Sequence, residues 1–330
     1  MNNQSTAIFK KMIPGILFGF LVLVALALVG DLRQVGEVFN RFNWWVFPLA
    51  LLLTLFNYGL RFVKFLYYMK LIGAETLSWQ EGLRIFVAGF PLAVTPGKAG
   101  EALKGVWIKQ ACGVAVGKGI SAVLAERISD GLAVLLLSTL GVMAYPQYWP
   151  AFALVLVLLG GLIVVSQIRP AAYWFLDLGA RIPVVKRFIG GLRDLYEGSY
   201  TLFKPVPTLI AVGLGMISWL GEGIGFYFIL TGLGLEPGAH LLGLAVFTLS
   251  FSTVVGAVSA LPGGLGAAEA SIAGMLTLLG GITPAVATSA TLLIRLATLW
   301  FGVLLGLVVW AFSLDLLGLR TQTDGTISES

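Results

Sequence analysis

The sequence has little charge: aspartate, glutamate, lysine and arginine together make up 11% of its 330 residues, whereas hydrophobic residues make up 58%. A water-soluble domain carries roughly 25% charged residues. Several nearly uncharged runs approach or exceed the ~18–20 residues that an apolar helix needs to cross a bilayer. These features exclude a soluble fold and predict an all-α polytopic membrane protein.

Cysteine and histidine are almost missing, since Cys112 and His240 are each the only residue of their kind. They cannot supply a disulfide framework or the ligand cluster of a zinc or haem site. A Ser-His-Asp triad cannot be assembled either, and "GKGIS" at 117–121 lacks the spacing of a phosphate-binding P-loop. We therefore expect no metal, no cofactor and no ATP-driven mechanism. The net charge of +5 does not indicate nucleic acid, because the basic residues cluster at membrane edges.

Six long apolar segments predict full membrane spans, at about 12–30, 44–66, 119–144, 151–168, 206–231 and 284–312. Lysine and arginine collect in the loops expected on one side of the membrane, whereas three loops expected on the other side have neither. Because basic loops stay in the cytoplasm, we expect a multi-pass protein of the cytoplasmic (inner) membrane with both termini in the cytoplasm.

Two further segments are expected outside the bilayer core. Residues 170–205 mix charged side chains with interleaved aromatic and leucine residues, which is typical of amphipathic helices at a membrane surface. The polar residues 321–330 are expected to form a disordered tail. Residues 1–320 are thus predicted to be a single transmembrane domain.

Pro-Gly sequences interrupt two other apolar segments, "FPLAVTPGKAGEALKG" (90–105) and "SALPGGLGAAEASIAG" (259–274). A helix over residues 83–95 would be only about 20 Å long and cannot cross a core of about 30 Å. We predict a re-entrant hairpin there, entering from the cytoplasm. The second interrupted element, at about 241–281, is either a full span or a re-entrant hairpin from outside. Residues suited to these tight turns are Pro96, Gly97, Gly100, Pro262, Gly263, Gly264 and Gly266.

The two interrupted segments repeat the same charge spacing. Glu101 lies 26 residues before Arg127, and Glu269 lies 26 residues before Arg295. Each half reads as a span, a hairpin and a span that carries an arginine, and the expected orientations of the halves are opposite. We predict an inverted repeat of about 44–144 and 206–312, whose broken helices build a site near the membrane midplane.

Charged residues at membrane depth are costly and are first read as functional. The alternative is a structural ion pair between helices, or a long side chain that snorkels to the surface. A substrate or coupling role and structural pairing both stay open for the hairpin charges. The candidate substrate-binding residues are Lys98, Glu101, Arg127, Glu269, Arg295, Arg61 and Glu222.

Other charged residues in the apolar segments have simpler explanations. We expect Lys64 and Arg84 to snorkel. Glu126 and Asp130 lie one turn apart on one helix face, and pairing with Lys104 or Lys118 suits them at least as well as catalysis. A paired-carboxylate enzyme, with Glu101 facing Glu269, is conceivable.

Four motifs in the chain resemble a known family: "TPGKAGEALKGVWIK" (95–109), "AERISDGLAVLLL" (125–137), "LPGGLGAAEA" (261–270) and "LLIRLATLWFGVLLG" (292–306). They are similar, in the same order, to the transmembrane region of lysylphosphatidylglycerol synthases. That region also forms stand-alone, flippase-like inner-membrane proteins, and the likeness covers about residues 10–315.

The resemblance implies that the protein moves a phospholipid or a polyprenyl-lipid or glycolipid headgroup across the membrane. The soluble synthase domain of the two-domain members has no counterpart here, so we do not expect an enzyme. In this hypothesis Lys98, Arg127 and Arg295 bind an anionic or phosphate-bearing lipid, while Glu101 and Glu269 hold an amine or a coupling proton. The alternatives are a transporter of a small anion or zwitterion, and a non-catalytic partner of a lipid-modifying enzyme. The headgroup, direction, energy source and oligomeric state stay open.

Overall fold

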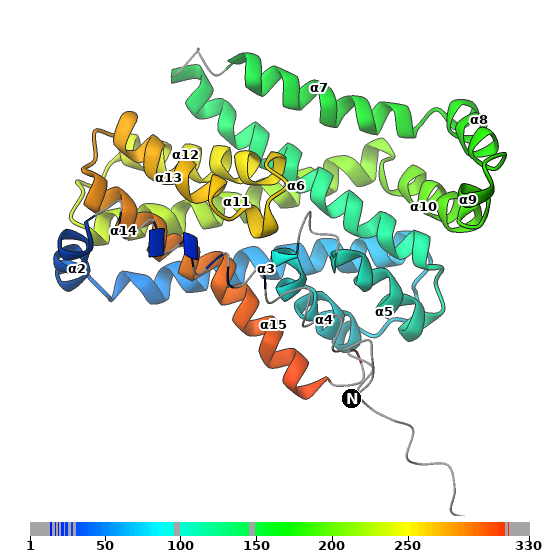
Figure 1. Ribbon diagram of the computed structural model, residues 1–330, viewed down its shortest axis with the longest axis horizontal. Coiled ribbons are helices and arrows are strands. Elements are labelled where there is room, and N and C mark those ends of the chain that lie inside the picture. Colours follow the sequence, from blue (N-terminus) through cyan, green and yellow to red (C-terminus); the bar gives the residue numbers. More distant parts are fainter. Residues whose placement is uncertain are drawn as a thin grey trace, which may run out of the picture.

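The computed structural model describes residues 31–95, 100–144 and 149–313, Leu316, and scattered positions between residues 14 and 28. Within these residues the regular structure is entirely helical, with no strand (Figure 1). The prediction of an all-α membrane fold is therefore confirmed.

Four segments among the described residues are long and apolar enough to cross a membrane. The last of them combines α14 (Pro284–Arg295), the π-helix η5 (Leu296–Trp300) and α15 (Phe301–Phe312). Three of the four coincide with predicted spans. The four segments are α3 (Val46–Leu71), α11 (Pro205–Gly232), α12 (Ala239–Val258) and Pro284–Phe312.

The prediction of six full spans is not confirmed. The predicted span at 12–30 lies mostly outside the described residues. The predicted span at 119–144 falls in α6 (Val116–Ala144), whose first half carries four charged residues. The part of α7 (Trp149–Ser166) that begins at Phe152 reaches spanning length only together with α8 (Arg169–Gly179), and the two are bent by 84°. α12, by contrast, is long enough to span, which the sequence left open.

Two pairs of helices contain the interrupted segments and are called the first and second hairpin below (Figure 1). The first contains α4 (Trp79–Ala88), the 3₁₀-helix η1 (Phe90–Val94) and α5 (Leu103–Cys112). Each α-helix has ten residues and is therefore about 15 Å long, too short to cross a core of about 30 Å. In the second hairpin, η4 (Pro262–Gly264) follows α12, and α13 (Ala267–Leu278) packs back against α12.

The two hairpins contact each other, because η1 of the first packs against η4 in the turn of the second. A Cβ atom built on Gly263 would lie 3.5 Å from Cγ1 of Val94. Gly263 and Gly264 have φ values of 62° and 67°, a left-handed conformation that glycine adopts without strain. Two chain breaks that are far apart in sequence thus meet in space.

α15 holds the first hairpin in position. The indole N–H of Trp310 donates a hydrogen bond of 2.8 Å to the carbonyl oxygen of Ala88, at the end of α4. Gly306 approaches η1 so closely that an added Cβ would overlap the ring of Pro91 and lie 2.8 Å from the carbonyl oxygen of Val87.

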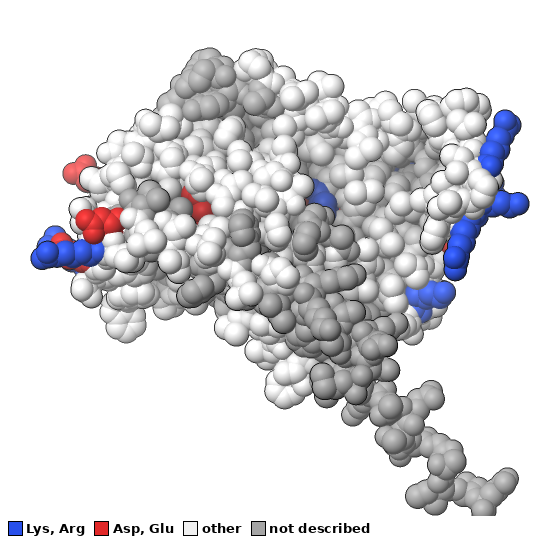
Figure 2. All heavy atoms as spheres, in the orientation of Figure 1, with Lys and Arg blue, Asp and Glu red and all other residues white. Residues whose placement is uncertain are grey.

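Charged side chains gather at two ends of the molecule (Figure 2). Lysine and arginine lie at one end, over α8, α9 (Pro183–Lys186) and α10 (Ile189–Leu202), and both signs of charge lie at the other end, over α2 (Leu32–Arg41). The face between them is largely uncharged, as in a protein whose middle lies in a bilayer. The helices α8–α10 form the segment predicted to be amphipathic.

Gly306→Ala tests the contact between α15 and η1. We expect the free energy of unfolding to fall by about 1–3 kcal/mol because the new methyl group overpacks against Pro91. Thermal unfolding of the detergent-solubilised protein measures the change. Gly160→Ala is the matched control, since a Cβ there meets no atom within 4 Å. Equal melting temperatures for both variants would contradict the packing described.

Candidate functional site

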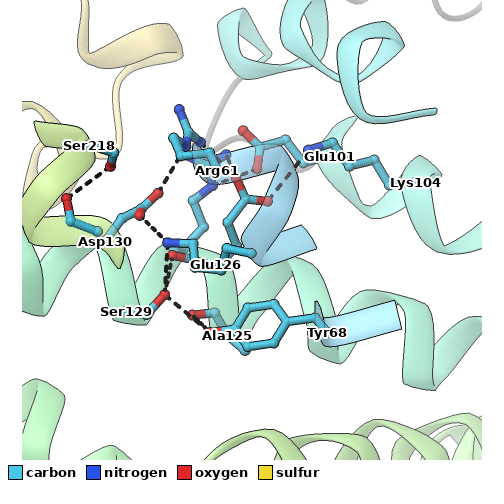
Figure 3. Close-up of polar contacts among 12 residues, drawn as sticks. Arg61, Tyr68, Glu101, Lys104, Ala125, Glu126, Ser129, Asp130 and Ser218 are labelled. Atoms are coloured by element: carbon cyan, nitrogen blue, oxygen red, sulfur yellow. Dashed lines mark hydrogen bonds and ion pairs between the residues drawn. The ribbon is translucent and has the colours of Figure 1, made fainter. Parts of the chain in front are cut away.

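A buried ion-pair cluster joins α3 to α6 (Figure 3). The Arg61 guanidinium lies 2.7 Å from Oε1 of Glu126 and 3.3 Å from Oδ2 of Asp130. Lys64 forms a further ion pair with Asp130. Glu126 and Asp130 share one face of α6 because they are four residues apart, and Arg61 and Lys64 share one face of α3. Each buried charge therefore has an opposite charge beside it.

The prediction that the Lys64 side chain snorkels to the surface is wrong. The residue is 0% exposed, and its ammonium also donates to the Ser129 hydroxyl at 3.2 Å. The Tyr68 hydroxyl donates to the same oxygen at 3.2 Å. A lysine in this position ties two helices together and does not reach the membrane surface.

The first hairpin brings Glu101 and Lys104 to the same cluster. Nε of Arg127 lies 2.9 Å from Oε2 of Glu101. The Lys104 ammonium lies 3.7 Å from Oε2 of Glu126 and 5.5 Å from the centre of the Phe86 ring. Lys104 thus connects both limbs of the hairpin to α6, and the expected pairing of Glu126 with Lys104 is found.

The second hairpin contains the corresponding pair. Nε of Arg295 donates to Oε1 of Glu269 at 2.6 Å, and Nη2 donates to the Gly263 carbonyl oxygen at 3.1 Å. The other Glu269 oxygen accepts the Gly266 N–H at 2.7 Å. Glu269 and Arg295 therefore fasten the Pro-Gly turn to α14.

These two hairpins and the helices around them enclose a cavity of about 160 Å³. Ser252 and Thr253 of α12 and Tyr58 of α3 contribute hydroxyl groups to its wall. Four cationic side chains and two carboxylates also line it, which makes it strongly polar for the interior of a membrane protein. The charged lining residues are Arg61, Glu101, Lys104, Arg127, Glu222 and Arg295.

Glu222 differs from the other carboxylates of the site. It is 4% exposed, and it forms no ion pair or side-chain hydrogen bond with any other residue that the structure describes. Glu101, Glu126, Asp130 and Glu269 all have such a partner. An ionised carboxylate buried in this way is costly, and Glu222 differs from the other four in having no bonded cation among the described residues.

The structure brings together most of the residues that the sequence singled out. Arg61, Glu101, Arg127, Glu222 and Arg295 line the cavity, whereas Glu269 is fully buried and bonded to Arg295. Lys98 falls outside the described residues.

The predicted turn residues have differing positions. Pro96 and Gly97 lie outside the described residues. The Gly100 N–H donates to the Thr95 hydroxyl at 2.9 Å. In the second hairpin, Pro262, Gly263 and Gly264 form η4, and Gly266 has φ 85°.

The sequence did not identify Lys104, Tyr58 or Trp219 as residues of the cavity wall. Lys104 has a detectable signal, because it follows Glu101 by three residues and so lies near it on a helical segment. Tyr58 precedes Arg61 by three residues and lies on the same side of α3. Trp219 carries no such signal, because an aromatic residue in a membrane helix most often faces lipid or the core.

Comparisons with known proteins agree on one family. The family model described as "Lysylphosphatidylglycerol synthase TM region" matches residues 13–306. A "UPF0104 membrane protein" from Methanothermobacter thermautotrophicus is 26% identical over 324 aligned residues, covering 88% of this chain and 91% of the relative.

Asp130→Asn tests whether the α3–α6 cluster depends on charge pairing. We expect the free energy of unfolding to fall by about 3–5 kcal/mol, because Lys64 is left buried without its counter-charge. Denaturation of the purified protein in detergent measures this. The double variant Lys64→Met with Asp130→Leu should recover most of the loss.

Asp177→Asn is the control for this experiment, because it breaks an exposed ion pair with Arg193 and should change stability by about 0–1 kcal/mol. If Asp130→Asn is as mild as this control, the buried pair is not what holds α3 to α6.

Proposed function

The chain belongs to the family of the lysylphosphatidylglycerol synthase transmembrane region, and from that premise we propose that it is a flippase-like transporter of lipid headgroups. The acyl or polyprenyl tails stay in the bilayer while the polar headgroup crosses through the cavity. The lipid is a phospholipid or a polyprenyl-lipid or glycolipid that carries a phosphate.

The observation that carries this proposal is the charge of the cavity wall. Arg61, Lys104, Arg127 and Arg295 all face the cavity, and cations gathered at membrane depth mark a binding site for an anion. A cavity of about 160 Å³ has room for about 11–16 waters at 10–15 Å³ of such space for each. This space suits a phosphate-bearing headgroup and is too small for lipid tails.

Arg127 is the best placed of these cations to bind phosphate. Its side chain is 30% exposed and is held through Nε by Glu101 and through Nη2 by Glu126, which lies 3.5 Å away, so the exposed part of its planar guanidinium is available to phosphate oxygens. Arg295 is 13% exposed and already bonded to Glu269 and Gly263. We therefore assign Arg127 the main phosphate contact and Arg295 the task of holding the second turn.

The backbone N–H groups at the described ends of the hairpin turns have little capacity left to bind a headgroup. The N–H groups of Gly100 and Gly266 are already bonded within their own hairpins. Side chains therefore provide the principal contacts with the headgroup.

We also propose that the two halves are an inverted repeat. The support is that both Glu–Arg pairs, with the same spacing in sequence, form the same kind of ion pair, and that η1 of the first hairpin packs against η4 of the second. Hairpins that enter from opposite faces of the membrane would meet in this way. The basic surface over α8–α10 (Figure 2) supports a cytoplasmic location for that end, and we also propose that both termini lie in the cytoplasm and that the membrane is the inner membrane.

Arg127→Gln tests the proposed function. In proteoliposomes with a headgroup-labelled phospholipid, we expect the rate of lipid flipping to fall at least tenfold, because the variant loses the most exposed cation of the site. Chemical quenching of the outer-leaflet label measures the rate. Glu101→Gln should lower the rate as well, since Arg127 is then no longer held in place.

Arg193→Gln is the control, because Arg193 lies on the exposed surface of α10 and the substitution should leave the rate unchanged. Unaltered flipping by folded Arg127→Gln protein would contradict the proposal. Uptake of a small soluble anion without lipid flipping would favour the solute transporter, and a new lipid species found by mass spectrometry would indicate an enzyme.

A further inference from the structure

Glu222 lies within electrostatic range of charged groups from three other helices. The groups from α3 and α14 are cations, Arg61 and Arg295, and the group from α6 is Asp130. The hydroxyl of Tyr58, also on α3, interacts electrostatically with Glu222. On the cavity wall, α12 adds the hydroxyl groups of Ser252 and Thr253. Neither cation bonds to Glu222, because Arg61 is bonded to Glu126 and Arg295 to Glu269.

The charges of the site are balanced when Glu222 is ionised. Counting the described residues that line the cavity together with every residue joined to them through a chain of ion pairs, there are five cations and five carboxylates. The cations are Arg61, Lys64, Lys104, Arg127 and Arg295, and the carboxylates are Glu101, Glu126, Asp130, Glu222 and Glu269.

A phosphodiester that enters this balanced site brings one uncompensated negative charge into a medium of low dielectric constant, which is unfavourable. Four of the five carboxylates cannot give up their charge without leaving a bonded cation unpaired. Glu222 can be neutralised without this penalty, because no cation is bonded to it.

We propose that Glu222 takes up one proton from water when a monoanionic phosphodiester headgroup binds in the cavity. This inference rests on the proposed function and adds the chemical class of the headgroup and its linkage to protons. The proton neutralises the free carboxylate, so the site plus bound phosphodiester returns to zero net charge. Release of the headgroup returns the proton to water, on whichever side the cavity then opens.

A headgroup amine is a poorer occupant of the same position. An ammonium beside Glu222 would lie near Arg61 and Arg295, which repel it. A proton bound to Glu222 forms a neutral carboxyl group, so it places no additional cation near Arg61 and Arg295. The geometry therefore favours a proton over an amine.

The test uses the full-length protein in detergent and dihexanoylphosphatidylglycerol, a soluble lipid with one phosphodiester and no amine. Calorimetric titration at one pH, in two buffers with different ionisation enthalpies, counts the protons taken up for each lipid bound. We expect up to one proton for the wild-type protein. Its affinity should fall by up to about tenfold per pH unit once Glu222 is ionised in the free protein.

Glu222→Gln mimics the protonated carboxyl group, so it should bind the lipid with no proton uptake and with an affinity that does not change over the same pH range. Glu236→Gln is the matched control, because Glu236 is exposed in the loop after α11, and it should behave like wild type. The proton count of the wild-type protein decides the question even if Glu222→Gln fails to fold.

Binding to the wild-type protein without proton uptake would overturn the assignment of Glu222 and leave the proposed function standing. Loss of binding in Glu222→Gln, again without proton uptake in wild type, would overturn it in favour of direct contact with the headgroup. If the wild-type protein does not bind the lipid, the proposed function fails and this inference fails with it.

Discussion

A charged side chain inside a membrane is strongly stabilised when an opposite charge is held beside it, since desolvation of a lone charge costs several kcal/mol. This constraint explains how the interior of the protein is arranged. α3 and α6 are joined by the pairs of Arg61 and Lys64 with Glu126 and Asp130. Each hairpin is in turn fastened to a long helix by one Glu–Arg pair.

The same constraint explains why the hairpins can break inside the apolar region. Non-helical backbone at membrane depth is tolerated only where protein or water satisfies its polar groups. At the second turn, Arg295 and Glu269 bond the Gly263 carbonyl and the Gly266 N–H. Beside Arg295, the π-helix η5 also disturbs the helical bonding, and Tyr58 donates to the Thr298 carbonyl oxygen at 2.8 Å. Irregular helices of this kind are frequent at functional sites, and here Tyr58, Arg295 and Thr298 all line the cavity.

Much of the site could be predicted from the sequence, because charge is rare in an apolar chain and its spacing is therefore conspicuous. The equal spacing of Glu101 to Arg127 and of Glu269 to Arg295 identified two pairs that the structure shows to be bonded. The role of Lys64 could not be predicted. A lysine on a membrane helix reaches either the surface or a neighbouring helix, and the choice depends on how α3 faces α6.

The number of spans was predictable only in part, because apolar composition alone does not determine whether a helix crosses the membrane. A helix such as α12 has the same apolar composition whether it crosses the membrane or forms one limb of a hairpin. α6 illustrates the opposite case, because the charges that reduce its apolar character are neutralised by α3 and by the first hairpin. The apolar content of a helix is judged from that helix alone. The residues that neutralise its buried charges belong to other parts of the chain.

The central claim is that the two hairpins enclose a water-accessible, anion-binding chamber within the apolar part of the protein. Thiol labelling tests it most directly, because Cys112 is the only cysteine and can be replaced by serine. In that background, Thr253→Cys places a thiol on the cavity wall, and Val157→Cys places one on the exposed apolar face of α7.

With the protein in a bilayer, a charged, membrane-impermeant thiol reagent should label Thr253→Cys and not Val157→Cys. Dihexanoylphosphatidylglycerol should slow the labelling of Thr253→Cys. Absence of labelling at Thr253→Cys, or labelling that the lipid does not slow, would contradict the account.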